Sequence, residues 1–199
     1  MGLRTIGRLA AMLVMGAGLA GCIDATVEVA VTSETTARAT MTQLMGADFY
    51  SMVKMSAESG EAGAEDFCAD GALTENADGS ATCVIVEEGP FAALSITEDE
   101  NAVTFTPAGP GLVRVGLPTE EMRSEIGADD QMDAETRQMV EAFFAGHSIT
   151  VKVSGGEIVD TNMARSADGR SAEQVIPFLD LINGTAELPD ELYAVVRAP

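Results

Sequence analysis

The stretch Thr26–Met41, TVEVAVTSETTARATM, decides the fold of this chain. Apolar and polar residues alternate from Val27 to Val31 and again from Ala37 to Met41, and the polar segment Ser33–Thr35 lies between them. A period of two is typical of a β-strand with one buried face, and a short polar segment between two such strands predicts a turn. The stretch therefore predicts an antiparallel hairpin.

The same period continues to the C-terminus, interrupted by segments rich in glycine, proline and aspartate. One further hairpin is expected over Phe67–Val86 with its turn at Asn76–Gly79, and another joins two strands across the turn Pro107–Gly111. The remaining expected strands are Ile149–Val153, Ile158–Met163, an edge strand ending at Pro177, and Leu192–Val196.

The clearest helical pattern covers Asp133–Ala145, with Asp133 as a candidate N-cap and Gly146 as the residue that ends the helix. A shorter helix is expected to begin at Asp48. Many antiparallel strands with two helices predict an α+β fold, in which an antiparallel sheet of several hairpins is packed on one side by one main helix and one short helix.

The N-terminus has the three parts of a secretory signal. Arg4 and Arg8 precede the apolar run Leu9–Leu19, which is shorter than the ~20 apolar residues of a transmembrane helix. The run ends in Leu19–Cys22, LAGC, which resembles the lipobox of bacterial lipoproteins. The resemblance implies cleavage before Cys22 and acylation of its thiol. We therefore expect a signal peptide over 1–21 and a single lipid-anchored domain over 22–199.

The net charge and the expected location of the domain limit the kinds of molecule that it can bind. Removal of a signal that holds Arg4 and Arg8 but no acid takes the formal net charge from −21 to −23, which opposes binding to nucleic acid. The anchor places the domain outside the cytoplasm, at the periplasmic face of a membrane. Ile23 rather than aspartate follows the cysteine, which by analogy with enteric bacteria favours the outer membrane where the cell has one.

Cys68 and Cys83 are the cysteines that remain besides Cys22. Disulfides persist outside the cytoplasm, and these two residues flank the turn of an expected hairpin, so they are predicted to pair. Their spacing differs from the CxxC of redox-active pairs, which favours a structural role.

The chain offers no convincing catalytic or metal-binding constellation. His147, the one histidine, follows the end of the main helix, and no serine lies in a Gly-x-Ser-x-Gly context. We therefore expect a protein that is not an enzyme, with no catalytic residue, no cofactor and no metal site. The acidic clusters Glu98–Glu100 and Asp129–Asp130 are interpreted as solvated loops, and weak calcium binding there stays open.

Two stretches together resemble the LppM-like domain of bacterial envelope lipoproteins. One is Cys22–Val29, where the lipidated cysteine runs at once into a strand, followed by Ser33 and a second strand that ends near Met41. The other comprises Gly155–Ile158, Thr161–Asn162, Asp168–Gly169 and Val175–Pro177. The resemblance implies an α+β fold similar to lipid-binding helix-grip domains and a role in binding envelope glycolipids.

Two functions follow as hypotheses. The first is a non-enzymatic envelope lipoprotein that binds a lipid or glycolipid, held in an apolar groove between the main helix and strands that carry Ala37, Ala39, Val113 and Val115. Its candidate ligand-binding residues are Met139, Phe143 and Phe144. The alternative is a structural or assembly lipoprotein that docks a protein partner in the envelope. A lumen under the helix favours the first, and a filled core with exposed apolar residues favours the second.

The methionines do not separate these hypotheses by sequence alone. Those on or near expected apolar faces suit either an acyl-chain lining or an ordinary core, because methionine adapts to irregular neighbours. They are Met41, Met45, Met52, Met55, Met132 and Met139.

Overall fold

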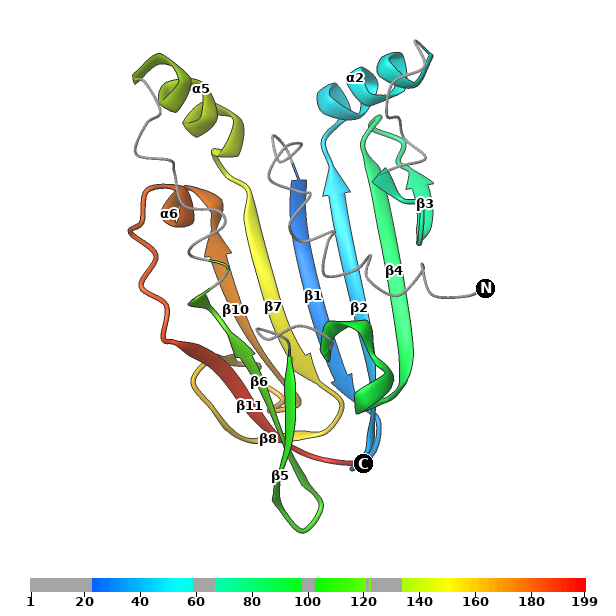
Figure 1. Cartoon of the computed structure of the whole chain (residues 1–199), viewed down its shortest axis with the longest axis vertical. Coiled ribbons are helices and arrows are strands. Elements are labelled where there is room, and N and C mark those ends of the chain that lie inside the picture. The colour runs from blue at the N-terminus through cyan, green and yellow to red at the C-terminus, as the bar shows by residue number, and fades with distance from the viewer. Residues whose placement is uncertain (1–22, 59–66, 98–102, 121, 123–133) are drawn as a thin grey trace.

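The structure is a computed structural model that describes residues 23–58, 67–97, 103–120, 122 and 134–199 (Figure 1). Within these residues the strands form two sheets. The larger sheet contains β1 (Ile23–Val31), β2 (Thr36–Met45), β3 (Ala72–Glu75), β4 (Ala81–Pro90), β7 (Ser148–Ser154), β9 (Ala164–Arg165) and β10 (Ser171–Pro177). The smaller sheet contains β5 (Thr104–Gly109), β6 (Leu112–Pro118), β8 (Glu157–Thr161) and β11 (Glu191–Arg197). The helices are α2 (Ala47–Glu58), α5 (Ala134–Phe144) and α6 (Phe178–Ile182), with 3-10 turns η2 (Phe91–Ala93) and η3 (Ser95–Thr97).

Strand β1 lies at the centre of the larger sheet, whose order is β3-β4-β2-β1-β7-β10-β9 in the described residues. On one side it forms the predicted hairpin with β2, with Val31 opposite Ala37. On the other side it pairs in parallel with β7, with Ala25 opposite Ile149. The sequence predicted antiparallel pairing only. A parallel neighbour needs a long connection, and the whole segment from β2 to α5 supplies it.

The chain changes sheets between β7 and β8. Gly155 has φ +112° and lies so close to Val31 that a Cβ would collide with the Val31 backbone. A Cβ on Gly156 would collide in the same way with the carbonyl of Arg197, at the end of β11. The two glycines let the turn pass between the sheets, which places β7 in the larger sheet and β8 in the smaller one.

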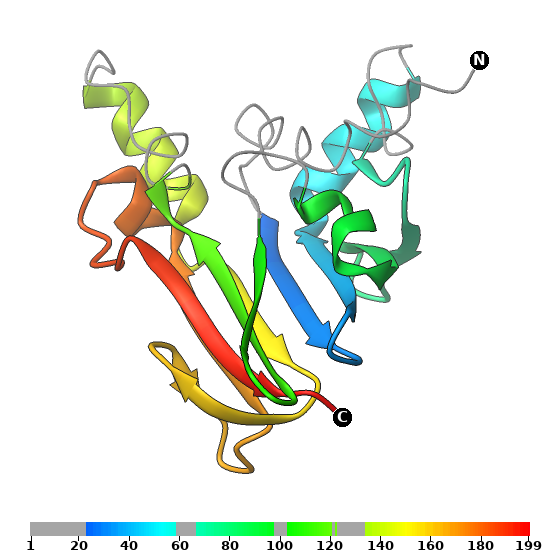
Figure 2. The same ribbon diagram turned by 60° about the horizontal axis from the view of Figure 1, so that its bottom comes forward.

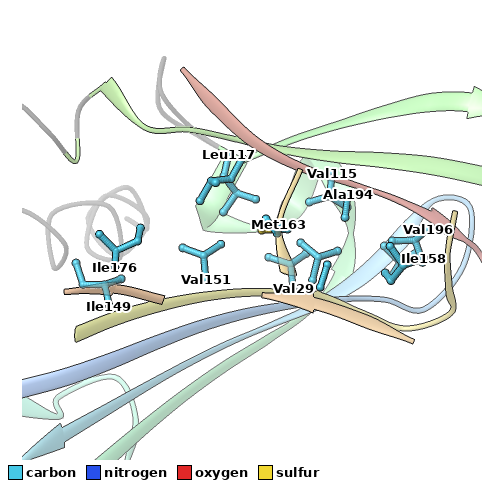
Figure 3. Close-up of a cluster of buried hydrophobic side chains, with 14 of the residues drawn as sticks. Val29, Val115, Leu117, Ile149, Val151, Ile158, Met163, Ile176, Ala194 and Val196 are labelled. Atoms are coloured by element: carbon cyan, nitrogen blue, oxygen red, sulfur yellow. The ribbon is translucent and has the colours of Figure 1, made fainter. Parts of the chain in front are cut away.

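The main core lies between the two sheets. Strands β1, β7 and β10 contribute Val29, Val151 and Ile176 from one side, and the smaller sheet contributes Val115 and Ala194 from the other (Figure 3). All five side chains are at most 2% exposed, as the alternating pattern requires of inward positions. Each large apolar side chain buried in this way contributes about 1.5–3 kcal/mol to folding.

Two smaller clusters cover the other half of the larger sheet. Met41, Cys83 and Ile85 pack against Cys68, while Met45, Ala81 and Tyr50 form a separate group. Tyr50 belongs to α2, so this helix lies over the last residue of β2 and the first residue of β4. Helix α2 begins near Asp48 as predicted and extends to Glu58.

The α+β class is confirmed. The helix that begins near Asp48 is longer than expected, since α2 spans 12 residues and α5 spans 11. The structure differs from the expected single covered sheet because the smaller sheet, together with the short helix α6, buries the inner face of β1, β7 and β10 (Figures 1 and 2). The expected strands over Ile149–Val153, Leu192–Val196 and before Pro177 are confirmed. Pro177 precedes α6, and β10 lies between β7 and the two-residue β9 rather than at the edge of its sheet.

Candidate functional site

The start of β1 is the described segment closest in sequence to the expected lipidation site. Cys22 and the signal segment lie outside the described residues, and β1 begins at the next residue, Ile23. Ile23 is opposite Met45 at the end of β2, and α2 begins two residues later. We call this end of the larger sheet the Ile23 end. Figure 1 shows α2 and α5 at this end and the C-terminus at the opposite end.

Asp24 fixes the start of β1 to the segment after α5. Its carboxylate accepts a hydrogen bond from the backbone N of Ser148 at 2.9 Å and lies 3.3 Å from Nδ1 of His147. His147 therefore has a local structural partner at the end of α5, close to the boundary role that the sequence predicted. The carbonyl of His147 also accepts a hydrogen bond from the backbone N of Phe178, which links α5 to α6.

The structure contains the predicted disulfide between Cys68 and Cys83, whose Cα atoms are 5.6 Å apart. Its placement differs from the prediction. Cys83 lies opposite Leu73 in the β3–β4 pair, and Cys68 lies in a helical turn that precedes β3. The bridge therefore fastens this turn onto β4, where both sulfurs are buried, instead of joining the two arms of the hairpin. The predicted turn at Asn76–Gly79 is present, with Gly79 at φ +87°.

The three candidate ligand-binding residues all lie on α5, but α5 does not cover the strands expected to face it. Phe144 contacts Phe178 of α6, with ring centroids 5.1 Å apart, whereas Phe143 is 44% exposed. Ala37, Val113 and Val115 belong instead to the core between the sheets. The expected groove between α5 and these strands is wrong, because the strands of the two sheets pack against each other instead of facing α5. Ligand binding by Met139, Phe143 and Phe144 stays a prediction.

A shallow apolar depression lies elsewhere, on the inner face of the larger sheet. Its volume is about 20 Å³, room for about one water molecule. Strands β1, β2 and β4 and turn η3 line it with Val27, Ala39, Thr40, Met41, Ile85, Glu87, Ser95 and Ile96. Sequence periodicity places the strand residues on one face, but nothing in the sequence indicates that η3 lies over them.

Glu87 holds η3 over this depression. Its Oε2 accepts hydrogen bonds from both the backbone N and the side-chain Oγ of Ser95, at 2.9 and 2.8 Å. The next residue, Ile96, is thereby placed at the rim. The rings of Phe91 in η2 and Phe105 in β5 stack with centroids 4.2 Å apart, so the segment is also tied to the smaller sheet.

A polar cluster lies on the smaller sheet, and the sequence analysis did not find it. Arg114 donates two hydrogen bonds to the carboxylate of Glu191 and lies over the ring of Tyr193, 4.5 Å from its centroid. These hydrogen bonds lower the pKa of Glu191 below its usual value. The hydroxyl of Tyr193 donates to Asp160, and this hydrogen bond raises the pKa of Tyr193. Every polar group named here has a partner, which indicates a structural cluster.

The methionines divide between core and surface. Met41 and Met45 are buried, whereas Met52 and Met55 on α2 are 46% and 61% exposed. Met132 lies outside the described residues. The acidic clusters Glu98–Glu100 and Asp129–Asp130 lie outside them as well.

The described part of the chain offers neither a metal-binding cluster nor a membrane-spanning helix. There, no group of three or more histidine, cysteine, aspartate or glutamate side chains could hold a metal ion. None of the helices within these ranges is both long and apolar enough to cross a membrane.

One solved structure is similar to this chain, whereas the comparisons with protein families and curated proteins find no match. The NMR structure of the folded domain of LppM from Mycobacterium tuberculosis is similar to this chain with a TM-score of 0.47 and 9% sequence identity, over 88% of this chain and 90% of that chain. No family and no function follow from similarity at this level.

Proposed function

We propose that this chain is a non-enzymatic lipoprotein of the bacterial cell envelope, held at the outer face of a membrane by acyl chains on Cys22. The observation that carries the proposal is the sequence before β1. A positive segment, a short apolar run and Leu19–Cys22 follow one another in the order that lipoprotein export uses. Two or three acyl chains anchor a protein stably, whereas one does so only marginally.

The experiment is acyl labelling and fractionation of cells that express the full chain. The wild type is expected in the membrane fraction with the label on Cys22, and Cys22→Ser is expected to lose the label and to leave the membrane or stay unprocessed. The matched control replaces the other two cysteines, Cys68→Ser and Cys83→Ser, and is expected to keep the label. A processed Cys22→Ser protein that remains in the membrane fraction contradicts the proposal.

The proposal that the chain is not an enzyme rests on the sequence, in which His147 is the one histidine and no serine lies in a Gly-x-Ser-x-Gly context. In the structure His147 lies 3.3 Å from Asp24, and Asp24 also accepts a hydrogen bond from the backbone N of Ser148, so this contact joins the start of β1 to the segment after α5. A triad needs a nucleophile within hydrogen-bond reach of its base. We therefore propose a binding or structural role for the anchored domain.

A second candidate function is binding of a lipid or glycolipid at the depression under η3. Its lining is apolar apart from Thr40, Glu87 and Ser95, and it opens at the molecular surface. A volume of about 20 Å³ holds a methyl-sized group and not an acyl chain, so this function requires displacement of η3. The alternative is docking of a protein partner, which the filled core between the sheets favours.

Native mass spectrometry of residues 23–199, purified after incubation with an envelope lipid extract, tests the second candidate. A co-purified lipid is expected, and Ile96→Ser at the rim is expected to reduce its occupancy. Val86→Ser is the matched control, because Val86 is on the same sheet but 52% exposed and outside the depression lining. Equal lipid occupancy in the two variants contradicts lipid binding at this place.

A further inference from the structure

We propose that the outward faces of α2 and α5 rest on the membrane that carries the Cys22 lipid, so that the domain stands with its Ile23 end on the bilayer. This inference rests on the proposed lipidation. The occupant of these faces is the lipid surface itself, and the exposed apolar side chains that meet it are Met52, Met55 and Phe143.

The proposed lipidation site is directly next to the start of β1 in the sequence. Consecutive Cα atoms are about 3.8 Å apart, so an acylated Cys22 lies one residue from the first residue of β1 with no linker between them. Asp24 is held by Ser148, and Ile23 is paired with Met45, so β1 is built into the sheet from its first residue. Whatever lies at the Ile23 end is therefore brought to the membrane surface with the anchor.

Helix α2 lies across this end with one face buried. Tyr50 is 2% exposed and packs with Met45 and Ala81, which end β2 and begin β4. The Tyr50 hydroxyl donates to Glu75 at 2.8 Å, and Lys54 pairs with the same carboxylate at 3.3 Å. The helix is thus fixed on the strand ends, and its other face points away from them.

The outward face of α2 carries two large apolar side chains beside the exposed polar residues Asp48 and Ser51. Positions 52 and 55 are three apart and share a face, and Met52 and Met55 are 46% and 61% exposed. Isolated exposed apolar residues need no explanation. These two lie at the end to which the chain is tethered, and an amphipathic helix with exposed apolar side chains lies in the plane of a membrane interface.

Helix α5 repeats the arrangement on the other side of β1. Phe144 packs inward against Phe178, which is 7% exposed, while the adjacent Phe143 is 44% exposed. Both helices lie at the Ile23 end on either side of β1 (Figures 1 and 2). A single lipid surface reached by the tether therefore meets the exposed side chains of both.

Charge selects the kind of lipid. Asp48 and Glu135 are exposed in the first turns of α2 and α5, and Lys54 is already paired with Glu75. The formal net charge of the chain is −21. Anionic headgroups repel such a surface, so the contact is expected with zwitterionic lipid through the apolar side chains.

Tryptophan fluorescence tests the orientation, because the chain contains no tryptophan. Met55→Trp, Phe143→Trp and Ala108→Trp are each prepared as the full, acylated protein in phosphatidylcholine vesicles with brominated acyl chains. Ala108 is the matched control, since it is exposed near the end of β5, next to the turn into β6 at the opposite end of the molecule (Figure 1). Tryptophan at 55 and at 143 is expected to shift to shorter emission wavelength and to be quenched, and tryptophan at 108 to be unaffected.

The mass of the Cys22 peptide, measured on the same samples, separates the two proposals. An acylated protein in which positions 55 and 143 are quenched no more than position 108 overturns the orientation and leaves the anchor standing. Quenching at one of the two positions overturns it as well, because the helices then do not share one surface. A peptide without acyl mass overturns the anchor and the orientation together.

Discussion

Gly155 lies against the backbone of Val31, at the point where the chain leaves the larger sheet for the smaller one. It also has φ +112°, a conformation that residues with a Cβ rarely adopt. The close approach of the turn after β7 to the end of β1 is therefore possible only because residue 155 has no side chain.

Gly155→Ala is expected to destabilise the domain by about 3 kcal/mol or more, because overpacking is added to the positive φ. The control is Gly169→Ala, whose glycine has φ +68° but no other atom within 4 Å of its built Cβ in the described structure. It is expected to cost about 1–2 kcal/mol. Urea unfolding of residues 23–199 measures both, and equal losses contradict the close approach.

The Cys68–Cys83 disulfide is expected to leave no free thiol in residues 23–199 after oxidising export. Its closed loop spans 15 residues, for which the chain-entropy model gives about 3 kcal/mol of stabilisation. Because both cysteines are at most 8% exposed, reduction is expected to be slow in the native state and fast in urea. Thiol titration with and without urea checks this, and two reactive thiols in the native protein contradict it.

The Arg114–Glu191 pair is expected to make the free energy of unfolding depend on pH in the acidic range. Hydrogen bonds from Arg114 hold the pKa of Glu191 below its usual value of 4.5. A lowered folded-state pKa gives stability that is present above the unfolded-state pKa and is lost as pH falls through the folded-state pKa. As the pH falls below 4.5, the wild type is therefore expected to lose more stability than Arg114→Gln. Unfolding at several pH values measures it. Arg114→Lys keeps the charge and is expected to lie between them, and parallel profiles for all three contradict the assignment.

Substitution of Phe178 at the start of α6 and of Phe143 near the end of α5 is expected to have very different effects on the free energy of unfolding. Phe178 is 7% exposed and packs in the main core, so Phe178→Ala is expected to cost about 3–5 kcal/mol. Phe143 is 44% exposed, so Phe143→Ala is expected to change the free energy of unfolding by about 0.5 kcal/mol at most. Thermal or urea unfolding checks both. A large loss for Phe143→Ala means that its ring is buried, and it also removes this residue from the membrane-facing surface.

The local elements were predictable because they rest on short-range patterns. Alternation over Val27–Val31 and Ala37–Met41 predicted the hairpin, and the structure contains it with Val31 opposite Ala37. Gly146 ends α5 with φ +88°, as expected of a residue after a helix. Such signals depend on side-chain period and backbone freedom, which each segment carries in its own residues.

Which strand face packs against which other element was decided only by the tertiary structure. The alternation of Val113 and Val115 shows that one face of β6 is buried, but not that it packs on β1 and β7 instead of on α5. Cys68 joins β4 from a turn rather than from a paired strand, and η3 lies over Met41 and Ile85 because Glu87 binds Ser95. Burial is non-directional, so a sequence fixes which side chains leave water, while long-range packing and hydrogen bonds choose their partners.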